Sequence, residues 1–162
     1  MAEIGIVASV FGIATAGFRV TQGLYKIADA IGSAGEEVRL LASDSDAFSQ
    51  MLLSLSEVLK KVIGPSSPSR LIITTEDILK ICEQILQPFE KILARLKPLL
   101  ERFKGSDRKM GQFGLRIQWI FRHKSKLLFY HKMLNSLKST LACLLATLNL
   151  QCSSNVDSAH AE

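Results

Sequence analysis

Apolar side chains recur at alternating steps of three and four residues in four long stretches of the chain, which is the spacing of one face of an α-helix. In the second stretch the stripe consists of Val38, Leu41, Phe48, Leu52, Leu55, Leu59 and Val62, with Ser45 filling the vacant place. In the last stretch it consists of Leu127, Tyr130, Leu134, Leu137, Leu141, Leu144 and Leu148. Because no stretch has the pattern of a strand, the sequence predicts an all-α fold, an antiparallel bundle of four main helices.

The expected helix ends carry recognisable signals. Ser33–Glu36 has the spacing of a capping box, which predicts that the first helix ends near Ile31 and the second begins here. Gly64 and Pro65 stop the second helix, and Thr74 or Thr75 caps the third. The last helix is expected to run from about Leu115 to Leu150.

The third stretch contains two prolines inside its helical pattern. Its stripe consists of Ile78, Cys82, Ile85, Phe89, Ile92, Leu96, Leu99 and Phe103. Pro88 and Pro98 each remove a backbone hydrogen bond, so we expect the third helix to be kinked or broken there. Residues 1–150 are therefore expected to form the bundle, and residues 151–162, which lack periodicity, a disordered polar tail.

The first stretch is unusual because no charged residue occurs from Ile4 to Phe18. An export signal requires positive residues before its apolar run, and this chain begins with Met-Ala-Glu, although Ala14–Ala16 imitates a cleavage site. A single membrane span needs about 20 apolar residues, and this run has 15, so we do not expect it to be inserted constitutively. The remaining interpretation is that this stretch forms one wall of a helical core. It agrees with the periodicity, and we favour it while the export signal stays open.

The opposite face of this first helix bears only small residues in its N-terminal half. Gly5, Ala8, Gly12 and Ala16 form a ridge of the small-xxx-small type, which allows helices to approach closely. Each interior glycine costs about 0.5–1 kcal/mol relative to alanine, so the ridge needs an explanation. Two remain open: a close crossing inside the bundle, or a conditional contact with a membrane or another copy.

Basic residues are concentrated in the last third of the chain. Residues 106–150 contain eight lysines and arginines and only one acid, within a total net charge of +5. Four of these bases alternate with aromatic residues and form a candidate patch for anionic lipid or an acidic partner: Arg116, Arg122, Lys124 and Lys126. The alternative is a packed layer whose bases extend into solvent, and we do not expect nucleic acid as a partner.

Motifs of known enzymes do not occur in the sequence. It contains no Gly-rich phosphate loop and no nucleophile motif, and its three histidines lack partners at metal-ligand spacing. We therefore expect no catalytic residue, no metal and no cofactor. The three cysteines lack a CxxC spacing, which favours an intracellular protein with reduced, buried thiols.

Two segments resemble a known family. Residues 5–48, GIVASVFGIATAGFRVTQGLYKIADAIGSAGEEVRLLASDSDAF, and residues 118–141, QWIFRHKSKLLFYHKMLNSLKSTL, are similar to the N-terminal domain of fungal STAND (NLR-like) and ankyrin-repeat proteins, of the azaphilone pigment cluster protein L type. The resemblance implies a HeLo-like helical bundle that executes incompatibility-type cell death by inserting its first helix into the plasma membrane.

The same resemblance sets the expectations for function. The domain would be cytoplasmic at rest and would reach the plasma membrane when activated, with anionic lipids, further copies or a homologous STAND-type protein as partners. The residues expected to insert are Ile4, Ile6, Val7, Val10, Phe11 and Ile13, while the small face would line helix–helix contacts. The alternative is a non-enzymatic adaptor that recruits a partner helix and never enters a membrane.

Overall fold

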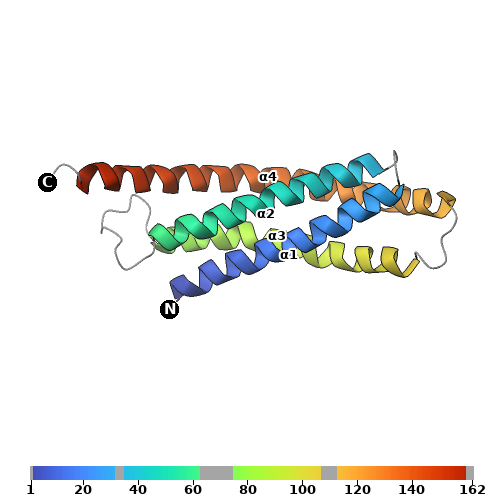
Figure 1. Cartoon of the computed structure of the whole chain (residues 1–162), viewed down its shortest axis with the longest axis horizontal. Coiled ribbons are helices and arrows are strands. Elements are labelled where there is room, and N and C mark those ends of the chain that lie inside the picture. The colour runs from blue at the N-terminus through green and yellow to red at the C-terminus, as the bar shows by residue number, and fades with distance from the viewer. Residues whose placement is uncertain (1, 32–34, 63–74, 107–112, 160–162) are drawn as a thin grey trace.

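Four helices account for the described part of the chain, which in this computed structural model comprises residues 2–31, 35–62, 75–106 and 113–159 (Figure 1). They are α1 (Ala2–Ile31), α2 (Glu36–Val62), α3 (Thr75–Ser106) and α4 (Phe113–Ala159). The prediction of an all-α fold with four helices packed as a bundle is confirmed.

The order of the helices around the bundle differs from their order in the chain. Helix α1 packs most extensively against α2, and α2 in turn packs against α4, while α3 contacts α1 and, more sparsely, α4. Consecutive helices alternate in direction, as an antiparallel bundle requires (Figure 1). Since α2 and α4 are spatial neighbours, however, these two run in the same direction, and so do α1 and α3.

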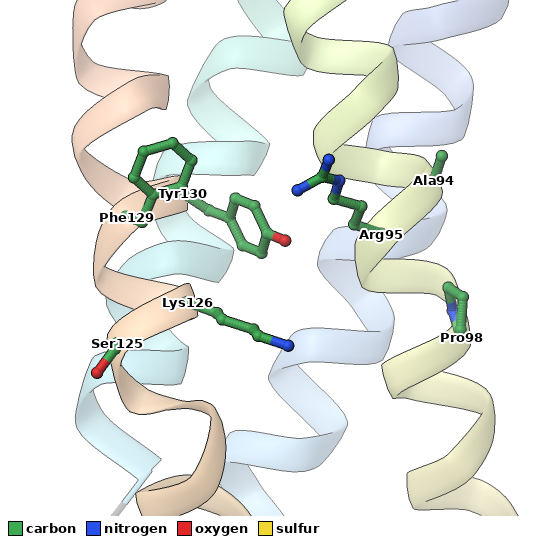
Figure 2. Close-up of a pocket in the computed structure, with 7 residues that line it drawn as sticks. All are labelled: Ala94, Arg95, Pro98, Ser125, Lys126, Phe129 and Tyr130. Carbon is green, nitrogen blue, oxygen red and sulfur yellow. The ribbon is translucent and has the colours of Figure 1, made fainter.

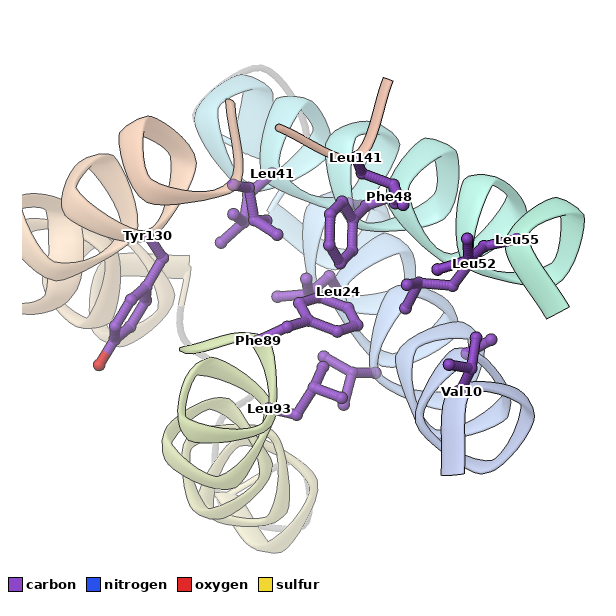
Figure 3. Packing of buried hydrophobic residues seen from close by; sticks show 14 of the residues in the cluster. Val10, Leu24, Leu41, Phe48, Leu52, Leu55, Phe89, Leu93, Tyr130 and Leu141 are labelled. Carbon is purple, nitrogen blue, oxygen red and sulfur yellow. The ribbon is translucent and has the colours of Figure 1, made fainter. Parts of the chain in front are cut away.

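The core lies where the predicted stripes of α2 and α4 meet α1 (Figure 3). Every member of the α2 stripe is buried, including Ser45, and the α4 stripe is buried except for Leu137, which is half-buried. Each large apolar side chain that is fully buried contributes about 1.5–3 kcal/mol relative to an exposed one. The binary pattern of the sequence therefore identifies these two core faces correctly.

Among the described residues of α3, Leu93 and Phe89 are buried in the core, and Phe89 has the larger side chain. Its ring lies edge-on to the ring of Phe48 on α2, with the ring centroids 4.5 Å apart (Figure 3). The ring also reaches α1 at Gly17, where an added Cβ would overlap the Ser49 hydroxyl and lie 3.1 Å from the Phe89 ring. Gly17 is thus a notch that allows α1, α2 and α3 to meet.

Helix α3 is continuous through both of its prolines. The predicted break at Pro88 or Pro98 does not occur, because the segment from Thr75 to Ser106 is one helix. Pro98 and Ala94, whose carbonyl group loses its usual donor to the proline ring, are both exposed, so water can satisfy that carbonyl.

Helix α4 extends further than the sequence predicts. We expected it to end near Leu150, yet it continues to Ala159, so the expected disordered tail is wrong for residues 151–159. The sequence of this segment contains neither glycine nor proline to stop the helix, and Cys152 packs against the core. Residues 160–162 lie outside the described part of the chain.

Candidate functional site

The residues expected to insert into a membrane differ in their exposure at rest. Val10 is fully buried, and Phe11 has 54% of its surface exposed. The half-buried residues that pack against the core are Ile6, Val7 and Ile13. The side chain of Ile4 lies outside the described residues. The apolar face of this helix is therefore buried at Val10, and it is exposed to solvent at Phe11.

The small face of α1 is exposed along its whole length. All four of its residues, Gly5, Ala8, Gly12 and Ala16, are exposed. Among the residues that the structure describes, no atom lies within 4 Å of a Cβ added at Gly5 or Gly12. The interpretation that a close crossing inside the bundle explains these two glycines is therefore wrong, and the close crossing of α1 occurs instead at Gly17.

Part of this small face lines a cleft between α1 and α3. The cleft has a volume of about 580 Å³. Its walls are Ser9, Gly12, Ile13 and Ala16 from α1 and Glu90, Leu93 and Ala94 from α3. The small side chains on the α1 side thus leave an unfilled space beside α3.

The different surroundings of Gly12 and Gly17 predict opposite effects of the same substitution. Gly12→Ala should raise the free energy of unfolding by about 0.5–1 kcal/mol, because alanine favours the helix and its methyl group enters open space. Gly17→Ala should lower it by about 1 kcal/mol, because overpacking against Ser49 and Phe89 outweighs the same helical gain. Urea unfolding of the two variants measures both effects, and equal effects would contradict this account of α1.

The candidate basic patch can be located at only one of its members. Lys126 is exposed on α4 and lines a second pocket, between α3 and α4, with a volume of about 490 Å³ (Figure 2). The side chains of Arg116, Arg122 and Lys124 lie outside the described residues. Arg95 of α3, which sequence reasoning did not select, lines the same pocket as Lys126.

Helices α2 and α4 are linked by a partly buried polar cluster around Asp44. The carboxylate accepts a hydrogen bond from Lys138 Nζ, and its other oxygen lies 2.5 Å from His131 Nδ1, in contact but without the alignment of a hydrogen bond. The Asn135 amide nitrogen lies 3.2 Å from the second ring nitrogen, Nε2. The cluster thus joins two parallel helices by a polar contact.

Sequence reasoning missed this cluster, although a signal was available. Asp44 lies beside the apolar stripe of α2, between Leu41 and Phe48, where a charge needs a partner. Its partners are 87 or more positions away in the chain, so only the packing of α4 on α2 reveals them. The prediction of buried thiols fails at Cys143, which is exposed, while Cys152 is half-buried.

No helix has, within the residues that the structure describes, an apolar stretch long enough to cross a bilayer. In the same part of the chain, no three His, Cys, Asp or Glu side chains are grouped so that they could hold a metal ion. Comparisons with protein-family models, with curated proteins and with solved structures give no match.

Proposed function

We propose that this chain is a HeLo-like domain that executes cell death of the fungal incompatibility type by permeabilising the plasma membrane through α1. The observation that carries the proposal is the small face, where two glycines come at a cost in helix stability and an added Cβ would contact none of the described residues. Such a face suits contact between helices in lipid, where small residues let backbones approach closely. The sequence resemblance points to the same role.

The energetics of α1 require a partner for this transition. Releasing its N-terminal half would expose Val10 and uncover the half-buried Ile6 and Ile13, each costing on the order of 1 kcal/mol or more. Only membrane or self-association can offset that cost. The uncharged segment from Ile4 to Phe18 would measure roughly 22 Å as a helix, shorter than a bilayer core of about 30 Å. We therefore propose that several copies insert together and locally thin the bilayer.

Replacing Gly12 by glutamate tests the proposal. The variant should fold as the original does, because the new side chain enters open space. It should nevertheless lose nearly all release of a fluorescent dye from vesicles that contain anionic lipid, because a carboxylate at the helix centre costs about 2.5–3.5 kcal/mol to insert. Dye release is measured against Gly12→Gln, which has the same shape without the charge and should retain more activity.

A second control separates the α1 surface from a general loss of apolar surface. Leu40 on α2 is exposed, as Gly12 is, so Leu40→Glu adds the same carboxylate at an exposed helix position outside α1. This control should leak dye like the original chain. Full dye release by Gly12→Glu would overturn the proposal. If the original chain neither floats with vesicles nor releases dye, the adaptor that recruits a partner helix becomes the better explanation.

A further inference from the structure

The pocket between α3 and α4 is lined by basic and aromatic side chains from both helices. Helix α3 contributes Ala94, Arg95 and Pro98, and α4 contributes Ser125, Lys126, Phe129 and Tyr130. Figure 2 shows the Arg95 guanidinium, the Lys126 ammonium and the Tyr130 hydroxyl directed into the gap between the two helices. Hydrogen-bond donors from two helices thus converge on one space.

The two cations in this pocket have no counter-charge in the described structure. Neither Arg95 nor Lys126 forms an ion pair or hydrogen bond with a described residue, and no acidic side chain is among the described residues that line the pocket. Glu90 of α3 does not line this pocket but lines the adjoining cleft between α1 and α3, which shares Ala94 with it. Two like charges facing one cavity repel each other, and a bound anion would remove that repulsion.

Tyr130 brings a further hydrogen-bond donor to the pocket. Only 5% of its surface is exposed, and its ring lies at the edge of the hydrophobic cluster, with the hydroxyl pointing away from the other labelled residues (Figure 3). The hydroxyl has no hydrogen-bond partner among the described residues, and it points into the pocket (Figure 2). The buried ring thus holds an accessible hydroxyl at the pocket, where it can donate a hydrogen bond to a ligand.

We propose that this pocket binds a phosphate monoester, held by the Arg95 guanidinium, the Lys126 ammonium and the Tyr130 hydroxyl. The planar guanidinium matches two phosphate oxygens, and the ammonium acts as a point charge beside them. A monoester carries about −1.5 to −2 charges near pH 7, which matches two cations better than the single charge of a carboxylate. Phe129, which is 59% exposed, adds apolar surface for the body of the ligand.

The phosphate can belong to a water-soluble ester or to a lipid headgroup, and two experiments distinguish these sources. In the first, glycerol 3-phosphate is titrated into the full chain by isothermal calorimetry, with acetate at equal ionic strength as the carboxylate control. In the second, flotation compares vesicles containing phosphatidic acid with vesicles containing phosphatidylserine at matched surface charge. The second experiment rests on the proposed membrane function, whereas the first does not.

Substitutions in the pocket should weaken binding of the phosphate probe. Arg95→Gln and Lys126→Gln should each raise the dissociation constant about tenfold, the loss of one charge-assisted contact, and Tyr130→Phe about threefold to tenfold. The matched controls Lys97→Gln on α3 and Lys132→Gln on α4 remove exposed bases that do not line the pocket, and they should change it less than twofold. Circular dichroism verifies the fold of each variant.

The outcomes separate this site from the proposed function. Binding of glycerol 3-phosphate, or a preference for phosphatidic acid that Arg95→Gln removes, supports the site and identifies the source of the phosphate. Binding of neither probe, equal binding of acetate, or equal weakening by the control variants would overturn it. Dye release by Gly12→Glu tests α1 alone, so either proposal can fail while the other stands.

Discussion

Replacing Phe89 by alanine should lower the free energy of unfolding by about 3–5 kcal/mol, the range for deleting a large buried aromatic ring. The ring is fully buried, contacts Phe48 and fills the notch at Gly17, so its removal leaves a cavity among three helices. The loss is a large share of the total free energy of unfolding, which is about 5–15 kcal/mol for a typical domain. Urea or thermal unfolding measures it.

The effect should be specific to the junction of α3 with the core. The matched control is Phe129→Ala, which removes the same ring from a site that is 59% exposed and should change stability by less than about 0.5 kcal/mol. Because Phe89 contacts α1 and α2, and α3 packs only sparsely against α4, the variant should also show faster hydrogen exchange along α3 than along α2. A cost below 1 kcal/mol for Phe89→Ala would show that α3 is held by other contacts.

The sequence was sufficient to predict the helices and much of the core because those features depend on local spacing. A stripe such as that of α2 repeats at helical intervals whatever lies opposite, and every predicted member of it is buried. Helix ends were predicted well where a cap or a Gly-Pro pair marks them. The end of α4 was not, since no breaker occurs after Leu150 and polarity alone does not stop a helix.

Features that depend on the approach of a distant helix could not be predicted. Gly5, Gly12 and Gly17 look alike in the sequence, yet of these three only Gly17 is covered by a neighbouring helix among the described residues. The ring that covers it, Phe89, lies 72 positions later in the chain, so local spacing does not reveal the contact. The parallel packing of α2 against α4 is equally hidden, since the sequence favours antiparallel pairing only for helices joined by short connections.

The pocket between α3 and α4 likewise combines features that local spacing predicts with features that depend on a distant helix. Lys126 was selected because bases and aromatic residues alternate around it. Tyr130 was assigned to the core stripe, which is correct for its ring but gives no indication of where its hydroxyl points. Arg95 lies in a helix whose pattern indicates only a solvated charge, and its position opposite Lys126 follows from the pairing of α3 with α4.

Replacing Asp44 by alanine should lower the free energy of unfolding by about 2–3 kcal/mol. The carboxylate is only 18% exposed and accepts a hydrogen bond from Lys138, so its removal leaves a partly buried ammonium without its acceptor. Removing one member of a buried pair costs about 3–5 kcal/mol, and the residual access of water to this cluster reduces that figure. Urea unfolding near pH 7 measures the loss.

A neighbouring carboxylate provides the control for Asp44. Asp46 accepts a hydrogen bond from Gln50 within its own helix at 2.7 Å, so Asp46→Ala should cost only about 0.5 kcal/mol. In a double-mutant cycle, Asp44→Ala should cost much less once Lys138 is replaced by methionine, because no buried ammonium then remains unpaired. Equal costs in both backgrounds would show that Asp44 acts without Lys138, and the contact would not position α4 on α2. A coupling of 1 kcal/mol or more would show that the contact between Asp44 and Lys138 stabilises the packing of α4 on α2 beyond the contribution of the apolar stripes.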